Sequence, residues 1–155
     1  MNEPVSRLTD EQQVYLRFFT EVGIINQLSS TRAERHLPHG LTLSQYSVLN
    51  HFVRGLPPKS PLELANAFQV TKGAMTNTIK QLEKKQFINV RPHESDGRSK
   101  IVSISQAGVQ AHHDAILGLQ HGLADFLSAF SPDEISRLLP LLEKIRVWLD
   151  NNRQG

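Results

Sequence analysis

The amino-acid sequence predicts a mostly α-helical chain with a minor α+β part, in which the β-structure is a single two-stranded hairpin. Three observations predict this fold class. Apolar residues recur at helical spacing over long stretches near both ends of the chain. Between them, two short segments rich in β-branched residues, 87–91 and 100–104, flank a polar turn. Two helix starts lie close together before the first strand, so the middle of the chain has the pattern of a winged helix-turn-helix.

The first long helix is predicted over about residues 10–35. Thr9 and Gln12 have the spacing of a capping box, in which the hydroxyl accepts from an early amide and the glutamine side chain binds back to the cap. The apolar stripe behind this cap is wide, because Tyr15 and Phe19 extend it. Such a stripe on a terminal helix predicts burial inside one chain or against a second subunit, and leaves both open. Its residues are Val14, Phe18, Val22, Ile25 and Leu28.

Proline and glycine separate the next helix from its neighbours. Pro38 cannot continue the first helix, and Gly40 suits a turn. A second capping box, from Thr42 to Gln45, starts a helix that is predicted over about residues 42–54. The glycine and prolines of residues 55–58 then break the chain again. The expected core positions of this helix are Leu43, Tyr46, Leu49 and Val53.

The central helix pair begins at Ser60, a capping serine followed by Pro61 at the first helical position and Glu63 at the third. This helix is short, and it offers Leu62, Leu64, Ala65 and Phe68 for packing. After a turn, Thr71 caps a longer helix that is predicted to extend to Lys85. Its inward positions are Met75, Ile79 and Leu82, and its opposite face carries Gly73, Thr76, Asn77, Lys80 and Lys84.

A long helix is predicted after the hairpin, over about residues 106–130, with Ser105 as its cap. Gly118 and Gly122 are four residues apart and therefore share one face of this helix. In a water-soluble protein, such a pair indicates that another helix crosses closely at that point, with a specific dimer motif as the alternative.

The last helix is predicted over about residues 132–151. Ser131 repeats the Ser-Pro-x-Glu start of the short central helix. Pro140 inside the helix predicts either a kink or two shorter helices that meet there. The apolar face consists of Ile135, Leu138, Leu139, Leu142, Ile145, Trp148 and Leu149.

The composition excludes several classes of protein. A chain of 155 residues fits one domain, or one domain with extensions, and a hydrophobic content of 39% is enough for a core. The chain has no run of about 18 apolar residues that would span a membrane, and no basic and then apolar N-terminal segment typical of a secretory signal. Without cysteine it has no disulfide, thiolate nucleophile, thiol redox switch or Cys-ligated metal. The expected compartment is the cytoplasm.

Positive charge is concentrated in one part of the chain. The net charge of the whole chain is only +2. Residues 59–100 hold eight Lys or Arg against four Asp or Glu, a net charge of +4, so the remainder carries −2. A basic segment on the predicted helix-turn-helix and hairpin indicates contact with nucleic acid, with a merely solvated lysine-rich face as the alternative.

Four motifs follow one another in this basic segment. They are Pro-Leu-Glu-Leu-Ala (61–65), Val-Thr-Lys-Gly-Ala-Met-Thr (70–76), Gln-Leu-Glu-Lys-Lys-Gln-Phe-Ile (81–88) and Ser-Asp-Gly-Arg-Ser-Lys (95–100). In this order and spacing, with long helices before and after, they resemble the MarR family of bacterial transcriptional regulators. The tip Asp-Gly-Arg-Ser-Lys is the most specific piece, and the resemblance covers most of the chain.

The resemblance implies a bacterial cytoplasmic regulator that binds palindromic operator DNA as a homodimer, as a repressor, and is associated with the nucleoid through that DNA. It implies a helical dimerisation region, residues 1–38 and 106–155, and a DNA-binding winged helix-turn-helix domain, residues 39–105. It also implies a small-molecule effector of unknown identity that shifts the spacing of the two recognition helices and so releases the DNA. No cofactor and no catalytic residue are expected.

Most of the predicted DNA contacts lie on the recognition helix. Thr76, Asn77 and Lys80 are placed against base edges in the roughly 12 Å wide major groove, because asparagine can pair bidentately with adenine and lysine favours guanine acceptors. Phosphate contacts give register and affinity without sequence information. The residues predicted there are Lys72, Lys84 and Lys85, together with the caps Ser60 and Thr71, whose hydroxyls can also donate to phosphate. Gly73 is predicted to belong to the same DNA-binding face.

The wing supplies the other predicted contacts. Arg98 is predicted to enter the minor groove, because a narrow A/T-rich groove has an enhanced negative potential that attracts arginine. Asp96 precedes it by two residues in a tight turn and is predicted to orient the Arg98 guanidinium. The alternatives are that Asp96 only stabilises the turn and that Arg98 is solvated. His93 and Lys100 are further candidates for contact with the DNA backbone.

Seven histidines make a zinc- or other metal-responsive regulator of the same fold the alternative function. Their spacing argues against a metal site, since no His-x-x-x-His pair or Glu-x-x-His set occurs. No motif of a hydrolase, metalloprotease, phosphate loop or dinucleotide site occurs either, so an enzyme is not expected. A protein-binding winged helix is disfavoured by the polar recognition face. Tyr46, Phe19 and His51 are candidates to line an effector crevice, with ordinary core packing as the alternative for each.

Overall fold

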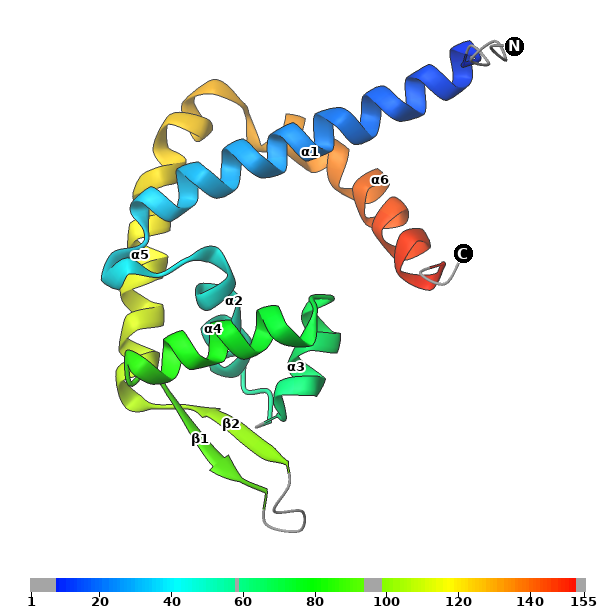
Figure 1. Cartoon of the computed structure of the whole chain (residues 1–155). Coiled ribbons are helices and arrows are strands. Elements are labelled where there is room, and N and C mark those ends of the chain that lie inside the picture. The colour runs from blue at the N-terminus through cyan, green and yellow to red at the C-terminus, as the bar shows by residue number, and fades with distance from the viewer. Residues whose placement is uncertain (1–7, 58, 94–98, 153–155) are drawn as a thin grey trace, which may run out of the picture.

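The computed structural model describes residues 8–57, 59–93 and 99–152. The predicted mostly helical fold with a two-stranded wing is confirmed. Figure 1 shows an open, arch-like molecule, with α1 across the top, α5 along one side, and the helix-turn-helix and wing below. In chain order the elements are α1 (Asp10–His36), the 3-10 turn η1 (Pro38–Gly40), α2 (Leu43–Val53), α3 (Pro61–Phe68), α4 (Lys72–Lys84), β1 (Ile88–Pro92), β2 (Lys100–Ile104), α5 (Gln106–Ala129) and α6 (Pro132–Asn151).

Side-chain caps fix the starts of the α-helices. A capping hydroxyl satisfies an amide of the first helical turn that has no partner inside the helix. This is why each predicted helix begins within one residue of its predicted position. Complete capping boxes are formed by Thr9, Ser60 and Ser131, and single side-chain caps by Thr42, Thr71 and Ser105.

The wing is an antiparallel pair of β1 and β2. Its register sets Ile88 opposite Ile104 and Pro92 opposite Lys100. An isolated β-bridge extends this pair, because the backbone of Lys59 exchanges hydrogen bonds of 3.2 and 2.9 Å with Val102. The segment that enters α3 is therefore fixed to the wing strand β2, which holds the wing and the helix-turn-helix as one unit.

The core lies inside the winged region. Leu49, Leu64, Leu82 and Val102 are completely buried and come from α2, α3, α4 and β2. The predicted inward residues of α4, Met75, Ile79 and Leu82, are all buried, which confirms that stripe.

The predicted core stripe of α2 is partly wrong. Leu49 is buried as expected, but Val53 is 40% exposed, and the other buried apolar residues of this helix are Val48 and Phe52. The cause is that α2 contacts α5 on one side and α4 and β2 on another, so its buried face is wider than a single stripe. Leu62 of α3, for which packing is predicted, is also exposed.

The first and last long helices bury none of their residues in this chain. Figure 1 shows the N-terminal part of α1 projecting away from the winged region, with α6 on the opposite side of the arch from α5. The wide apolar stripes predicted for both helices are therefore not covered within one chain. Val14, Ile25 and Leu28 of α1 are 67%, 62% and 65% exposed, and Trp148 of α6 is 63% exposed.

Two glycines allow α1 to cross α5 closely, as the sequence predicts. A Cβ atom added to Gly118 would overlap the His36 carbonyl oxygen, and one added to Gly122 would lie 2.8 Å from the His36 ring. Arg32 reinforces the crossing with a 2.6 Å ion pair to Asp125. The C-terminal end of α1 is thus fixed to the middle of α5.

The last helix continues through Pro140 as one element, so the alternative of two shorter helices is wrong. Pro140 has no N–H, so one hydrogen bond of the helix is missing, but the helix does not end there. None of the helices in the described ranges has the length and hydropathy needed to cross a membrane.

Candidate nucleic-acid interface

The exposed face of α4 is the centre of the candidate interface. The helix is held in place by the burial of Met75, Ile79 and Leu82 on its other face. Because residues three, four and seven positions apart share one side of a helix, the outward side chains form one continuous polar and basic strip. These exposed residues are Lys72, Gly73, Thr76, Asn77, Lys80 and Lys84, as the sequence predicts.

Thr71 fixes the N-terminal end of this strip. Its hydroxyl accepts a hydrogen bond from the Ala74 amide at 3.2 Å, which confirms its role as cap. The preceding turn is closed by Gln69 in a left-handed conformation, with φ of 56° and ψ of 38°. An added Cβ at Gly73 would meet nothing within 4 Å, so the backbone there is open to close approach by a partner.

The Thr76 hydroxyl is partly committed to the helix. It donates to the Lys72 carbonyl oxygen at 2.8 Å, which leaves its lone pairs and its methyl group to face outward. Threonine in this state can accept a hydrogen bond from a base or contact the methyl group of thymine. Asn77 and Lys80 are exposed beside it and keep their full donor capacity for the same surface.

Ser60 is engaged by its own capping box. Its hydroxyl donates to Glu63 Oε2 at 2.7 Å and accepts from the Glu63 amide at 3.3 Å. The hydrogen bonds from the backbone and side chain of Ser60 lower the pKa of Glu63. The predicted cap is confirmed, while contact of the hydroxyl with phosphate stays a prediction.

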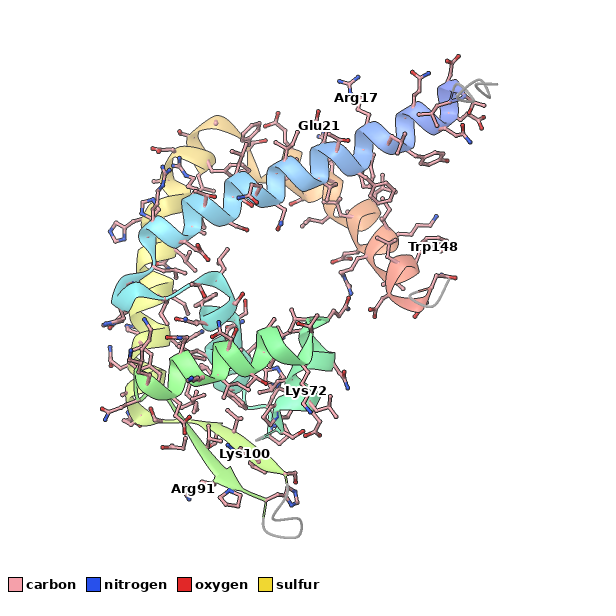
Figure 2. The ribbon with its side chains drawn as sticks, viewed as in Figure 1. Arg17, Glu21, Lys72, Arg91, Lys100 and Trp148 are labelled. Carbon is pink, nitrogen blue, oxygen red and sulfur yellow. The ribbon has the colours of Figure 1, made fainter. Side chains whose placement is uncertain are left out.

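The wing carries two exposed cations within the described residues of its strands. Figure 2 shows Arg91 on β1 and Lys100 on β2, with Lys72 on α4 above them. The base of the wing tip is closed by a 2.9 Å hydrogen bond from the His93 amide to the Ser99 carbonyl. The predicted contacts Asp96 and Arg98 lie outside the described residues.

Arg91 was not among the residues predicted from the sequence to contact DNA. It is exposed, as is Asn89 two positions earlier, while Ile88 is buried between the sheet and the core. The alternation of side chains along a strand places residues 89 and 91 on one face. That alternation was present in the sequence and is the signal that could have identified Arg91.

Lys85 differs from the other lysines of this region. It is half-buried, and its Nζ donates to the carbonyl oxygens of His39 at 2.6 Å and Gly40 at 2.8 Å. Its ammonium is therefore held by the protein itself. The predicted phosphate contact of Lys85 is not supported by this geometry.

The histidines do not gather into a metal site. Within the described residues, no group of three or more His, Cys, Asp or Glu is placed to hold a metal ion. His39 forms a 2.8 Å ion pair with Asp114. His112 is buried, stacks on Tyr46 with ring centroids 5.5 Å apart, and shares a 3.1 Å hydrogen bond with Asn50. Tyr46 thus packs against α5, and a role for it in effector binding stays a prediction.

A cavity of about 320 Å³ lies where α1, α2 and α4 face one another. Its lining includes the polar side chains of Asn26, Ser30 and Ser47 and the apolar side chains of Phe68 and Met75. The remaining effector candidates of the sequence lie elsewhere: His51 packs against Phe52 and Phe68, and Phe19 lines a separate hollow between α1 and α6.

Comparison with known proteins identifies the same region. The family model "MarR family" matches residues 41–100. The chain is 29% identical over 101 residues to the HTH-type transcriptional regulator PecS of Dickeya dadantii; the match covers 64% of this chain and 61% of that protein, so this chain aligns with less than two thirds of PecS.

Solved structures have the same fold. The transcriptional regulator BldR from Sulfolobus solfataricus superimposes with a TM-score of 0.76 and 25% identity, over 90% of this chain and 99% of that chain. A cysteine-to-serine variant of MarR from E. coli, in complex with operator DNA, gives a TM-score of 0.75 and 22% identity, over 88% and 99% of the two chains. The segment 41–100, which holds the recognition helix and the wing, therefore matches the MarR family, and the chain has the winged helix-turn-helix fold of these structures.

Proposed function

We propose that this protein is a repressor that binds palindromic operator DNA as a homodimer and is released from it by a small molecule. The observation that carries the proposal is the exposed polar and basic strip of α4, opposite a fully buried apolar face. An α-helix fits the major groove, where side chains such as Asn77 and Lys80 can tell base pairs apart. The related MarR structure, which contains operator DNA, supports this use of the fold.

The homodimer is supported by apolar surface that one chain leaves open. Contiguous apolar patches of this kind on a soluble protein mark interaction sites. Because α1 and α6 both expose apolar side chains, we propose that residues 1–38 and 106–155 form the dimerisation region. Residues 39–105 would then form the DNA-binding domain. Exposed residues of this surface include Val14, Ile25, Leu28, Leu138, Leu142 and Trp148.

Two recognition helices in such a dimer would meet two half-sites about one helical turn, or about 34 Å, apart. The operator is then expected to be palindromic, because a two-fold symmetric protein presents the same surface to each half-site. The expected location of the protein follows from this partner and is the bacterial cytoplasm, at the nucleoid.

We further propose that the effector enters the cavity between α1, α2 and α4. The cavity touches the inner face of the recognition helix at Met75 and the dimerisation helix at Asn26. A ligand that fits better when these helices are further apart would shift the protein toward a spacing that no longer matches the operator.

At the wing, we propose that Arg98 enters the minor groove and that Asp96 orients it. The exposed Arg91 and Lys100 on the two strands below support a basic wing. The Arg98→Ala variant is expected to lose most specific DNA binding while remaining a folded dimer. Unchanged operator affinity in a gel-shift assay at physiological salt would contradict this role.

The function as a whole is tested with DNA from the intergenic regions next to the gene. Gel shifts with purified protein are expected to find one fragment that is bound far more tightly than random DNA of equal length, with affinity that falls steeply as salt is added. A transcription assay on that fragment then separates repression from activation. Equal affinity for all fragments, or a flat salt dependence, would contradict the proposal.

A further inference from the structure

The C-terminal end of α4 is attached to the joint between α1 and α2. That joint is the turn η1, in which His39 and Gly40 both have left-handed backbone conformations with φ of 59° and 60°. Lys85, the residue that caps the end of α4, donates from its Nζ to both of their carbonyl oxygens, at 2.6 and 2.8 Å. One side chain thus joins the end of the recognition helix to the end of the long N-terminal helix.

A second set of contacts converges on the same end of α4. The Ser105 hydroxyl, at the start of α5, donates to the Gln86 carbonyl oxygen at 2.7 Å. Gly108 allows the first turn of α5 to pack directly on the backbone of Phe87, since an added Cβ would overlap the Phe87 carbonyl oxygen. The recognition helix is therefore attached to α5 as well as to the joint with α1.

His39 closes the connection between these two attachments. Its Nε2 lies 2.8 Å from Asp114 Oδ2 on α5, and its ring meets the ring of Phe87 edge-on at 5.8 Å. Glu34 of α1 also accepts a hydrogen bond of 2.9 Å from the Leu43 amide at the start of α2. The ends of α1 and α4, the start of α2 and the N-terminal part of α5 are thus connected at one place, which we call the Lys85 junction.

The opposite end of α4 is attached differently. There Thr71 binds within its own helix, and the preceding turn meets α6 through a 2.7 Å hydrogen bond from Gln69 Nε2 to Asp150 Oδ1. That bond joins two side chains, and Gln69 is exposed. Lys85 is half-buried, and its acceptors are backbone carbonyl groups, which have no side-chain rotamers. A movement of α1 or α5 would therefore reach α4 most directly at its C-terminal end.

We propose that Lys85 is a positioning residue for operator binding: it couples the placement of the recognition helix to the α1–α2 joint and does not contact DNA itself. This inference rests on the proposed function. A lysine suits the role, because its ammonium carries three donors that can serve two carbonyl oxygens at once. Methionine has a similar length but no donor, so it removes the two hydrogen bonds and keeps most of the packing.

The test compares Lys85→Met with Lys84→Met, since Lys84 is the exposed neighbour with the same charge. Binding of each variant is measured on the fragment found by gel shift, over a range of salt, and on versions whose half-sites lie one or two base pairs closer or further apart. Lys84→Met is expected to lower the slope of log affinity against log salt by about 0.9 for each phosphate that the variant no longer neutralises, and to keep the preference for the natural spacing.

Lys85→Met is expected to behave in the opposite way. Its salt slope stays that of the unaltered protein, its affinity for the natural fragment falls about tenfold, as expected when one or two hydrogen bonds are removed, and its preference for the natural spacing largely disappears. Lys85→Arg keeps the positive charge and N–H donors that can serve both carbonyl oxygens, so it is expected to keep the spacing preference. This separates positioning from a general loss of folding. A lowered salt slope with an intact spacing preference would overturn the inference and return Lys85 to the phosphate contacts.

A measurement without DNA keeps this inference separate from the proposed function. In Lys85→Met, amide hydrogen exchange is expected to rise at residues 37–41 and 85–88 together, whereas Lys84→Met leaves both segments unchanged. Unchanged exchange in Lys85→Met would overturn the junction even if the operator is bound as proposed. An unaltered protein that binds no fragment specifically would instead overturn the proposed function.

Discussion

Individual residues decide the local geometry of this protein through very short contacts. Gly118 and Gly122 show this most clearly, because the space of a single methyl group at either position is occupied by His36. The sequence predicts the close crossing from the spacing of the two glycines alone. It could not predict the partner, since His36 is more than eighty residues away in the chain.

Replacement of Gly118 by alanine is expected to destabilise the protein by roughly 1–3 kcal/mol, the usual effect of adding a group to a packed contact. The added Cβ would overlap a backbone oxygen of His36, so α1 must shift. Urea denaturation measures the change. Gly73→Ala is the matched control, because a Cβ there meets nothing within 4 Å; equal stability of the two variants would contradict the crossing.

Two histidines give the stability a defined dependence on pH. Burial, and then the neighbouring His113, lowers the pKa of His112, and burial, followed by the charges of Lys59 and Arg54, lowers the pKa of His51. The unfolded chain therefore binds more protons than the folded one between the ordinary histidine pKa of about 6.5 and the lowered values.

The free energy of unfolding is accordingly expected to be constant above about pH 6.5 with respect to these groups and to fall as the pH decreases below it. Urea denaturation at pH 7.5 and pH 5.5 measures this difference. In His112→Phe, which keeps a ring for stacking on Tyr46 but cannot be protonated, the difference should be smaller than in the unaltered protein. A stability that rises on acidification would contradict the assignment.

At the scale of elements, capping residues make the helices predictable and long-range contacts limit the prediction. The starts of α3 and α4 follow from Ser60 and Thr71, because a cap acts within one turn of its own helix. The buried face of α2 is only partly predictable, because several other elements pack on that helix and a local pattern does not contain them.

The candidate site was likewise predictable where local patterns determine it and not where long-range contacts do. The outward strip of α4 follows from helical periodicity, and its residues are exposed as predicted. Lys85 is one residue beyond Lys84 and has the same chemistry, but its partners are carbonyl groups of residues 39 and 40, which no spacing rule connects to it. Arg91 lies outside the wing-tip motif, so only the alternation of side chains along β1 indicates its exposure.

Removal of the Ser60 cap tests the α3 element directly. Ser60→Ala is expected to lower the free energy of unfolding by roughly 0.5–2 kcal/mol, because the Glu63 amide loses its acceptor. Ser60→Thr should retain most of the stability, since threonine keeps a hydroxyl that accepts from the Glu63 amide and donates to the Glu63 carboxylate. Thermal denaturation of both variants decides the matter, and an alanine variant as stable as the unaltered protein would show that the cap contributes nothing.

At the scale of the whole molecule, the main feature is the apolar surface that a single chain leaves exposed. Large apolar side chains line α1 and α6, and Figure 2 shows Trp148 on α6 at the outer end of the arch. The proposed dimer explains why these faces coexist with a well-buried core in the winged region. It also explains how two recognition helices acquire a fixed distance.

A charge on this surface is expected to break the dimer. Ile25→Glu places a carboxylate at a position that is 62% exposed in one chain and buried in the proposed dimer, where an unpaired charge is strongly unfavourable. Light scattering should show a monomer for this variant and a dimer for Gln27→Glu, since residue 27 faces the opposite side of the same helix. A dimeric Ile25→Glu protein would place the interface elsewhere.

The central claim is that the exposed strip of α4 reads the operator, and Asn77 tests it most directly. Fluorescence anisotropy measures the affinity of three proteins for the operator and for random DNA. They are the unaltered protein, Asn77→Ala and, as a control, Gln120→Ala, which changes an exposed amide on α5. Asn77→Ala is expected to weaken operator binding by about 1–3 kcal/mol for each base pair that Asn77 reads and to leave binding of random DNA unchanged, with Gln120→Ala like the unaltered protein. Full operator affinity in Asn77→Ala, or an equal loss on both DNAs, would contradict the claim.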